Sequence, residues 1–400
     1  MVPLEMEKKY LVVNLGSASK KYALYEGDNE LFFAHYEKEG SDVVVTEGKN
    51  GARIRSVITP QEYEVSAKRL VDLLIASGCI TALNDISAIG FRVVAPGEYF
   101  NATKLIDDEY RAKLAQEYEI APLHVVAVSK GIEEIYALFP ETPLVAVSDS
   151  VFHAELPDYA RTYALPIEDS KKLSLYRYGY HGISIRSVLH TIKEIAGAVP
   201  SRVIVCHLGG GASVTAVKDG KSVDTSMGFT PLEGLVMATR SGDIDSGALI
   251  YLARKLGLSL EALDEYLNHQ CGLLGLSGGK ESGVRELIEL EKAGDENAKL
   301  ALAVFTYRIR KYIGAYTAVL GGLDMLVFTA TIGERSSIIR ARVCEGLECF
   351  GVKIDELKNN LILGATSDFI DDGKLSVRVV VIKTNEMAQI VKDMTVLLEM

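Results

Sequence analysis

Two stretches of the sequence align with each other and decide the expected fold. Val12–Gly27 reads VVNLGSASKKYALYEG, and Val205–Gly220 reads VCHLGGGASVTAVKDG. At this offset (205 − 12 = 193 residues) they share five identical residues. Each reads as a strand, a glycine-rich turn, a second strand and a polar hairpin turn. An offset near half of the 400-residue chain is typical of a duplicated protein. We therefore expect two similar domains that face each other across a cleft.

Outward from these hairpins, strand-like and helix-like stretches alternate in both halves of the chain. Short stretches rich in β-branched residues predict strands at 11–15, 22–25, 31–35, 42–46, 86–94, 143–147, 203–206, 213–218, 325–329 and 377–382. Apolar residues at helical spacing predict helices at 62–76, 107–117, 123–138, 246–256, 260–268, 298–320, 336–350 and 386–398. This alternation is typical of α/β domains. We expect a first domain over 1–150 plus 386–400 and a second over 151–385.

The composition excludes several classes of protein. Lys plus Arg number 43 and Asp plus Glu 54, so the formal net charge is −11. This balance argues against a nucleic-acid or acidic-membrane binder, but not against a small anionic substrate. The five cysteines contain no CxxC pair, which predicts free thiols and no zinc knuckle. The first residues lack the apolar core of a signal peptide, and no apolar run reaches the ~18 residues of a membrane span. We expect a soluble, cytoplasmic protein.

The glycine-rich turns of the two hairpins are candidate phosphate sites. Asn14–Ser19 in the first hairpin and His207–Ser213 in the second are small and polar. Small residues let backbone N–H groups approach an anion closely, and hydroxyl groups add donors. Lys21 lies just beyond the first turn. The alternative, a tight hairpin without a ligand, suits either turn alone but explains the pair less well.

Further motifs follow in order along nearly the whole chain. The longest is Asp224–Asp245, which reads DTSMGFTPLEGLVMATRSGDID. The others are Asn14–Lys21, Phe91–Val94, Ala121–His124, Arg177–Gly182, Ile332–Glu334 and Thr384–Glu386. Together they resemble the acetate kinase family of the actin/Hsp70/sugar-kinase superfamily. The resemblance implies an α/β fold of two duplicated actin-like (ribonuclease H-like) domains with a central interdomain cleft.

The resemblance also implies a reaction: reversible, direct in-line transfer of a phosphoryl group from ATP to acetate, giving acetyl phosphate and ADP. A carboxylate with a solution pKa of ~4 is already ionised at pH 7 and needs no general base. The site must instead relieve the repulsion between two anions. By resemblance, Arg92 and Arg240 supply positive charge and His181 binds the transferring phosphoryl oxygens. Asp149 completes the catalytic set.

The same resemblance assigns the substrate and metal contacts. The acyl pocket is expected to consist of Arg92, Val94, Leu123, Tyr180 (usually Phe in the family) and Pro231. Val94 favours acetate, with propionate as the alternative substrate. Mg²⁺, or Mn²⁺, is assigned to Asn14 and Glu386, whereas Asp149 either binds the metal or orients an arginine.

The nucleotide and partner assignments also come from the resemblance. The expected contacts with ATP are Lys21, His207, Leu208, Gly209, Gly210, Gly211, Ser282, Gly283, Val284, Arg285, Thr331, Ile332, Gly333, Glu334 and Arg335. The family also implies a homodimer formed through the second domain. No nucleic-acid or membrane partner is expected.

Several positions depart from the family pattern. Gly210 replaces an Asn in the second phosphate turn, Gly283 replaces an Asp, and Thr331 replaces a Gly. The transfer residues are therefore kept while nucleotide contacts are eroded, which leaves a pyrophosphate-dependent acyl kinase open as an alternative. A non-catalytic, nucleotide-sensing paralogue is the alternative of another class. Loss of Arg92, Asp149, His181 or Arg240 would favour it, and all four are present.

Overall fold

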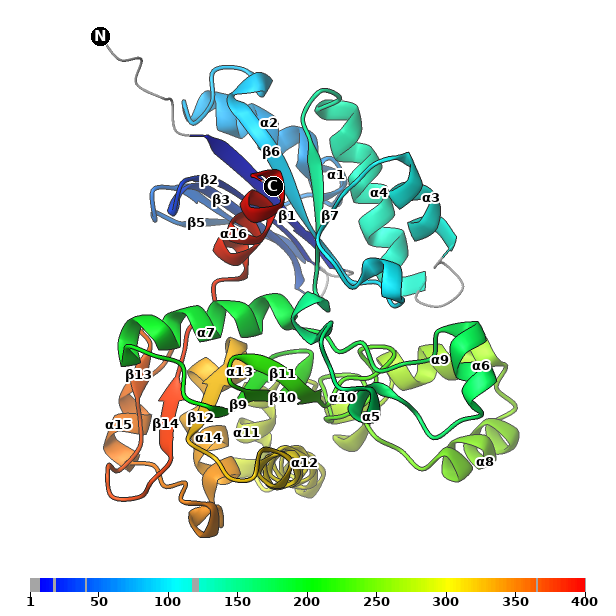
Figure 1. Cartoon of the computed structure of the whole chain (residues 1–400), viewed down its shortest axis with the longest axis vertical. Coiled ribbons are helices and arrows are strands. Elements are labelled where there is room, and N and C mark those ends of the chain that lie inside the picture. Colours follow the sequence, from blue (N-terminus) through cyan, green and yellow to red (C-terminus); the bar gives the residue numbers. More distant parts are fainter. Residues whose placement is uncertain (1–7, 17–18, 40–41, 117–121, 365, 400) are drawn as a thin grey trace. The chain divides into compact units, whose positions relative to one another are not determined.

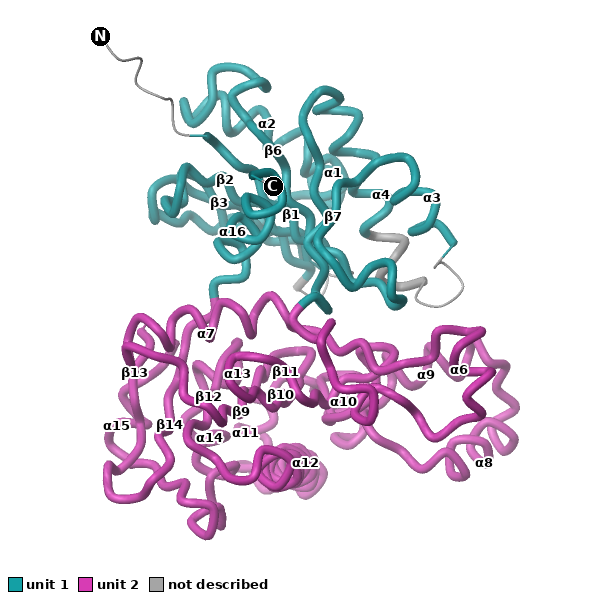
Figure 2. Tube along the Cα trace, in the orientation of Figure 1, with its two compact units in different colours: residues 1–151, 385–400 teal, residues 152–384 magenta. Residues whose placement is uncertain are grey.

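A computed structural model describes residues 8–16, 19–39, 42–116, 122–364 and 366–399. Its secondary structure is a mixture of helices and strands, and it contains two sheets (Figure 1). The chain forms two compact units, Met1–Val151 with Asn385–Met400 and Phe152–Thr384 (Figure 2). Each unit contains one of the sheets, so the α/β architecture expected from the sequence is confirmed.

The first unit holds an eight-stranded sheet in the order β5-β4-β3-β2-β1-β6-β8-β7. Its strands are β1 (Lys9–Leu15), β2 (Ser19–Glu26), β3 (Asn29–Glu39), β4 (Asp42–Lys49), β5 (Ile54–Ile58), β6 (Ile86–Val93), β7 (Lys104–Leu105) and β8 (Leu144–Ser148). Strands β1 to β5 form antiparallel pairs, whereas β1, β6 and β8 run parallel. Its helices and 3₁₀ turns are α1 (Pro60–Glu64), α2 (Ser66–Ala76), η1 (Leu83–Asp85), η2 (Glu98–Phe100), α3 (Asp108–Gln116), α4 (Pro122–Leu138) and α16 (Glu386–Leu398).

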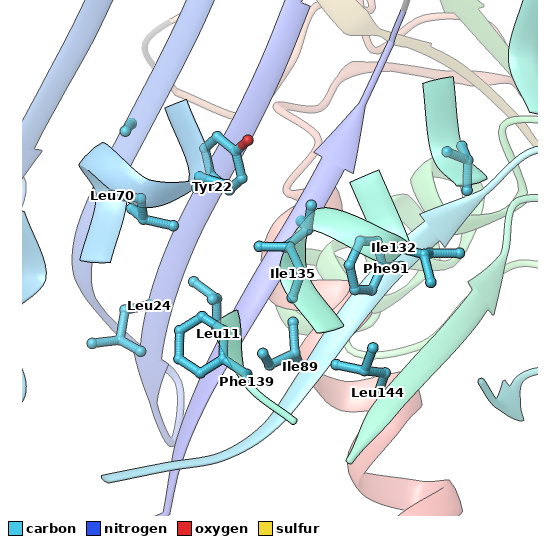
Figure 3. Packing of buried hydrophobic residues seen from close by; sticks show 14 of the residues in the cluster. Leu11, Tyr22, Leu24, Leu70, Ile89, Phe91, Ile132, Ile135, Phe139 and Leu144 are labelled. Atoms are coloured by element: carbon cyan, nitrogen blue, oxygen red, sulfur yellow. The ribbon is translucent and has the colours of Figure 1, made fainter. Parts of the chain in front are cut away.

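Helices cover both faces of this sheet, which explains why β1 and β8 are continuous apolar runs rather than alternating ones. On one face, Ile89 and Phe91 of β6 pack with Ile132 of α4 (Figure 3). Gly90 points to the opposite face, because successive strand residues alternate. A Cβ at Gly90 would lie 2.7 Å from Met394 Sδ, so α16 packs directly on the backbone of β6.

The second unit holds a six-stranded sheet in the order β11-β10-β9-β12-β14-β13. Its strands are β9 (Arg202–Leu208), β10 (Ala212–Lys218), β11 (Lys221–Thr225), β12 (Met325–Thr329), β13 (Asp368–Phe369) and β14 (Arg378–Val381). A 3₁₀ turn, η4 (Val151–His153), begins where the first unit ends. The other helical segments are α5 (Asp158–Arg161), α6 (Ile167–Leu173), α7 (Gly182–Ala196), α8 (Ser246–Leu256), α9 (Leu260–His269), α10 (Gly272–Leu276), α11 (Val284–Lys292), α12 (Glu296–Leu320), α13 (Ala330–Arg335), α14 (Ser337–Cys344), η5 (Glu348–Phe350) and α15 (Glu356–Leu361).

Helix α7 forms part of the core of the second unit. Ile185, Val188 and Ile192 of this helix pack with Val205 and Val327 of the sheet. No helix was predicted here from the sequence, so the presence of α7 corrects that expectation. The helix begins after a residue with a left-handed backbone (φ 62°) and without a side-chain cap, so the usual start signal is missing.

The two sheets repeat the same arrangement of strands. β9 begins 193 residues after β1 (Lys9 to Arg202) and ends 193 residues after it (Leu15 to Leu208). β1 pairs antiparallel with β2 and parallel with β6, and β9 pairs antiparallel with β10 and parallel with β12. The duplication expected from the two hairpins is therefore present in the fold.

Two predicted helices differ from the observed ones. The helix expected at 62–76 is divided into α1 and α2 at Val65, which has a non-helical backbone (φ −92°, ψ 21°). Thr59 and Glu62 form a capping box that starts α1 earlier than predicted. The helix expected at 336–350 ends at Cys344. Gly346 then adopts φ +79°, which turns the chain into the short 3₁₀ segment η5.

The expectations about membrane-spanning helices and cysteines can be compared with the structure. Within the described ranges, no helix has both the length and the apolar character needed to cross a membrane. All five cysteines are free thiols, as the absence of a CxxC pair predicts.

Candidate active site

The first group of candidate residues lies at the C-terminal ends of the parallel strands of the first unit's sheet. Arg92 is near the end of β6, and Asp149 directly follows β8, the parallel neighbour of β6. Arg92 Nη2 donates a hydrogen bond to Asp149 Oδ2 over 2.8 Å. Asp149 is only 1% exposed, so this is a largely buried ion pair. Of the two roles left open for Asp149, this contact fits the one in which it orients an arginine.

Asn14, near the end of β1, links this ion pair to Glu386, the first residue of α16. Arg92 Nη1 donates to Asn14 Oδ1, and Asn14 Nδ2 donates to Glu386 Oε2, both over 3.5 Å. Burial lowers the pKa of Arg92, but the charges of Asp149 and Glu386 outweigh burial and raise this pKa above its ordinary value. Arg92 therefore stays positively charged.

The donor atoms of this cluster can be tested against the expected metal. Among the residues with a described placement, no three His, Cys, Asp or Glu side chains gather around a common point suited to an ion. Glu386 offers a carboxylate, and Asn14 would offer its amide oxygen after a turn of the amide group, whose nitrogen faces Glu386 in this structure. Magnesium usually takes one or two carboxylates together with waters and substrate phosphates. The donor set therefore fits a magnesium ion that binds with a nucleotide, rather than one that the protein holds alone.

The second group surrounds the glycine-rich turn between β9 and β10 in the second unit. The rings of His181 and His207 stack, with centroids 3.9 Å apart and planes inclined by 17°. His181 Nδ1 lies 2.9 Å from Ser213 Oγ, and His207 Nδ1 lies 2.9 Å from Ser184 Oγ. Two serines, to which the sequence analysis gave no role of their own, therefore fix the orientation of both rings.

Gly211 leaves a space between two of the predicted transfer residues. A Cβ at Gly211 would lie 3.5 Å from His181 Nε2 and 3.5 Å from Arg240 Nη1. A side chain at this position would occupy that space. Guanidinium and imidazole N–H groups are suitable donors for phosphoryl oxygens. The structure thus brings the turn, His181 and Arg240 together around a place that would stabilise an anion.

The long motif at 224–245 folds into connected loops that contain Arg240. Arg177 Nη1 donates to the carbonyl oxygens of residues 225–227 over 3.0 to 3.3 Å, and Arg177 Nη2 pairs with Glu233. A Cβ at Gly228 would lie 1.7 Å from Glu233 Oε2, so a side chain there would have to displace the Glu233 carboxylate. Gly228 and Glu233 of the motif therefore pack tightly against each other.

Arg240 is held from within the same motif. Arg240 Nη1 donates to Pro231 O over 3.2 Å and lies 3.7 Å from Met237 Sδ. Pro231 is one of the residues expected to line the acyl pocket. A predicted catalytic residue and a predicted substrate contact are therefore in direct contact.

The other acyl-pocket candidates lie in different parts of the molecule. Tyr180 is 1% exposed, and its hydroxyl donates to Phe229 O over 2.6 Å, two positions before Pro231. Val94 directly follows β6 in the first unit and is half-buried. The side chain of Leu123 lies outside the described residues. The structure therefore associates Tyr180 with Pro231, and the pocket as a whole remains a prediction.

The nucleotide candidates lie on several elements. Gly209 of the turn lies near the start of α13, because a Cβ there would be 3.7 Å from Ala330 Cβ. Thr331–Arg335 form the rest of α13, and Ser282–Arg285 lead into α11. An open hollow of about 660 Å³ beside α11 is lined by Glu281, Arg285, Glu286, Glu289 and Leu290. Lys21 lies on β2 in the first unit.

Two buried charged residues hold α13 in place. Glu334 Oε1 accepts hydrogen bonds from the N–H groups of Ala330 and Thr384, both over 3.1 Å. Burial raises the pKa of Glu334. Arg340 is fully buried and donates to the carbonyl oxygens of Gly333 and Glu334 over 2.9 Å. The sequence analysis missed Arg340; an arginine among the apolar residues of α14 was the available signal.

This chain is similar in sequence to known acetate kinases. The model of the acetokinase family matches residues 9–392. The acetate kinase of Coprothermobacter proteolyticus is 43% identical over 393 residues, which cover 96% of this chain and 98% of that protein. The acetate kinase of Bacillus cytotoxicus is 41% identical over 390 residues, with the same coverage of both chains.

Solved structures agree with the sequence matches. Porphyromonas gingivalis acetate kinase superposes with a TM-score of 0.86 at 37% identity, covering 98% of this chain and 100% of that chain. A propionate kinase from Francisella tularensis superposes with a TM-score of 0.87 at 38% identity, covering 96% and 98%. The acetate kinase of Entamoeba histolytica gives a TM-score of 0.85 at 28% identity, covering 98% and 100%.

Proposed function

The chain belongs to the acetokinase family, and from this premise we propose that it catalyses reversible transfer of a phosphoryl group between ATP and acetate, giving acetyl phosphate and ADP. It is a phosphotransferase with a carboxyl group as acceptor. Identities of 41–43% to acetate kinases over 96% of the chain argue against the non-catalytic paralogue.

One observation carries the proposal: Gly211 leaves a space bordered by His181 Nε2 and Arg240 Nη1. A carboxylate attacks the terminal phosphoryl group without first losing a proton, so the task of the protein is positioning and charge stabilisation. Arg240, held by Pro231 O, would bind the equatorial phosphoryl oxygens. His181, whose Nδ1 is fixed by Ser213, would donate from Nε2 to the same oxygens. Such contacts strengthen as charge develops in the transition state.

Arg92 is proposed to supply the positive charge of the first unit. Its guanidinium would bind the acetate carboxylate, which suits bidentate hydrogen bonding. Asp149 fixes one side of the guanidinium over 2.8 Å, so its orientation is set before the substrate binds. Asp149 is therefore proposed as a positioning residue rather than a metal ligand.

Magnesium, or manganese, is proposed to bind with the nucleotide. Asn14 and Glu386 would hold it through oxygen atoms, for which the Asn14 amide would turn its oxygen from Arg92 toward Glu386. When bound, the ion neutralises part of the phosphate charge. The orientation of the carboxylate and the phosphoryl group is proposed to depend on Arg92, His181 and Arg240.

The experiment that tests this function is an acyl phosphate assay with a panel of donors. The purified protein is incubated with acetate, Mg²⁺ and one of ATP, GTP or pyrophosphate, and Arg240→Ala serves as the control for contaminating kinases. We expect acetate-dependent acyl phosphate with ATP. Turnover with pyrophosphate in the absence of nucleotide would show that pyrophosphate, rather than ATP, is the phosphoryl donor. The absence of acyl phosphate with every donor would refute the proposal.

Acetate is proposed as the preferred acyl substrate over propionate. The half-buried Val94 would limit the pocket to a short chain. One extra methylene changes discrimination by only ~1–3 kcal/mol, so propionate should be a weaker substrate rather than an excluded one. The similarity to a propionate kinase at 38% identity is consistent with a preference that few residues can alter.

Helix α8 supports the proposal of a homodimer formed through the second unit. None of its residues is buried, and the apolar residues Ile250, Tyr251 and Leu256 are 54%, 64% and 57% exposed. Adjacent exposed apolar residues commonly mark an interaction site. Sedimentation should give dimers of the wild type and monomers of the double variant Ile250→Glu, Tyr251→Glu. Leu357→Glu, at a leucine 78% exposed on α15, is the matched control and should stay dimeric.

The remaining proposal concerns location. We propose that the enzyme works in the cytoplasm, where its five free thiols would stay reduced. Fractionation of cells that produce the tagged chain would test it, and recovery with the membrane fraction would contradict it.

A further inference from the structure

We propose that Tyr163 and Tyr180 are positioning residues that set acyl specificity through the main chain of Phe229. The inference rests on the proposed function and deepens it, because it names what holds the acyl side of the site. Neither hydroxyl is expected to touch a substrate. Both act on a loop that carries Pro231 and contacts Arg240.

Two tyrosine hydroxyls hold the two main-chain polar atoms of Phe229. The N–H group of Phe229 donates to Tyr163 Oη over 2.8 Å. Tyr180 Oη donates to the carbonyl oxygen of Phe229 over 2.6 Å. Tyr163 Oη also donates to Glu233 Oε2 over 2.5 Å. One residue of the loop is thus fixed by side chains from two other segments of the chain.

The fixed residue lies two positions before Pro231. The proline ring fixes φ of Pro231 and also restricts the backbone of the preceding Thr230, so a shift at Phe229 is less easily absorbed before it reaches Pro231. Pro231 O accepts from Arg240 Nη1 over 3.2 Å. The tyrosine hydroxyls are therefore placed to control both a wall of the expected acyl pocket and the orientation of the arginine.

Both tyrosines are themselves immobilised. Tyr180 is 1% exposed, and its main-chain oxygen lies 3.0 Å from His153 Nε2. His153 Nδ1 is in turn 2.8 Å from Ser222 Oγ. A Cβ at Gly228 would lie 2.2 Å from Tyr163 Oη, so the loop is packed tightly against that hydroxyl. Rigid side chains of this kind can transmit their position to the loop.

The hydroxyl of Tyr180 can be removed by substitution without removing the ring. A phenylalanine would fill the same volume but could not donate to Phe229 O. The hydrogen bond is therefore an added restraint on the loop, and its removal leaves the packing of the ring in place.

The test compares Tyr180→Phe and Tyr163→Phe with Tyr178→Phe. Tyr178 is a matched control because it is also buried and its hydroxyl donates to Ser174 O over 2.7 Å, a carbonyl outside the loop. We expect the ratio of kcat/KM for acetate to that for propionate to fall roughly three- to tenfold in Tyr180→Phe, the scale of one lost hydrogen bond. Tyr163→Phe loses two hydrogen bonds and should lower this ratio at least as much. Tyr178→Phe should leave this ratio unchanged, and the KM for ATP should stay unchanged in all three.

Hydrogen–deuterium exchange in the ligand-free protein separates this inference from the proposed function. Exchange in the segment 228–234 should be faster in Tyr180→Phe and Tyr163→Phe, and unchanged in Tyr178→Phe. If the wild type makes no acyl phosphate, the proposed function fails, and the acyl-specificity inference that rests on it fails with it. The exchange then still decides whether the hydroxyls hold the loop. Unchanged exchange in Tyr180→Phe, or faster exchange with an unchanged acetate-to-propionate ratio, overturns the inference.

Discussion

The two units share one arrangement of strands but anchor their arginines differently. In the first unit a buried carboxylate holds the guanidinium, with Arg92 Nη2 2.8 Å from Asp149 Oδ2. In the second unit a main-chain oxygen does so, with Arg240 Nη1 3.2 Å from Pro231 O. The duplicated scaffold determines where the turns lie, whereas the anchoring of each charge depends on residues that the two halves do not share. Each half should therefore be sensitive to different substitutions.

The largest expected effect tests whether both arginines matter despite their different anchors. Arg92→Ala and Arg240→Ala should each lower kcat at least about 100-fold, because each removes a charge that stabilises the transition state. Steady-state kinetics with ATP and acetate measure the loss, and circular dichroism checks that the fold is retained. Near-normal turnover in folded Arg240→Ala protein would remove this residue from the catalytic set.

Two glycines, one in the loop that holds Arg240 and one in strand β6, separate a functional from a structural role. Gly228→Ala should lower kcat by about tenfold or more, because the new Cβ would lie 1.7 Å from Glu233 Oε2 and displace the loop that holds Arg240. Gly90→Ala should instead destabilise the first unit by about 1–3 kcal/mol through overpacking against α16, with kcat of the folded protein nearly unchanged. Equal losses of kcat in the two variants would contradict the distinction.

Asp149→Asn tests the carboxylate anchor, which has no counterpart in the contact between Arg240 and Pro231. The change keeps the shape of the side chain but leaves the guanidinium of Arg92 without its charged partner. Because the Arg92 side chain is 20% exposed, we expect a loss of about 1–3 kcal/mol in the free energy of unfolding, less than for a fully buried pair. Urea denaturation measures it. A stability equal to that of the wild type would mean that the ion pair does not anchor Arg92.

The smallest expected effect concerns Val94, the first unit's candidate for a small apolar contact with the acyl group. Val94→Ala should lower the KM for propionate relative to that for acetate by a factor of about three, because the removed methyl groups make room for a longer chain. Kinetics with both substrates give the ratio. If the preference does not move, Val94 does not line the pocket, and selectivity would have to come from the residues around Pro231.

The elements that could be predicted from the sequence carry strong local signals. The helices expected at 246–256 and 386–398 match α8 and α16 at both ends, and their caps, Asp245 and Asn385, are visible in the sequence. Helix α7 lacks such a start signal, because His181, the residue before it, has a left-handed backbone and no side-chain cap. The apolar spacing of Ile185, Val188 and Ile192 was the remaining signal for this helix.

The charged site residues could be predicted from motifs, and so could Asp149 and Pro231, which hold the two arginines. Other residues that position the site could not. Tyr163 lies 66 and 70 positions from Phe229 and Glu233, the residues to which its hydroxyl is bonded. Ser184 is 23 positions from His207. Hydrogen bonds over such separations depend on the tertiary fold, and a single sequence gives no local sign of them.

The structure changes the interpretation of Gly283, one of the positions that depart from the family's nucleotide contacts. The sequence analysis treats Gly283 as the loss of a carboxylate. However, a Cβ at Gly283 would lie 2.2 Å from Glu286 Oε2, so another carboxylate occupies the place of the missing side chain. The same carboxylate group accepts from Arg285 Nε over 2.9 Å. The start of α11 therefore still has an acidic group beside position 283.

The most direct test of the central claim, that the two differently anchored arginines serve one phosphoryl transfer, is a double-mutant cycle on kcat. Arg92→Ala, Arg240→Ala and the double variant are compared with the wild type in the ATP and acetate assay. Residues that act together on one transition state show strongly non-additive losses. We predict that the double variant loses much less than the product of the two single losses. A loss equal to that product would contradict the account, since each arginine would then act independently of the other.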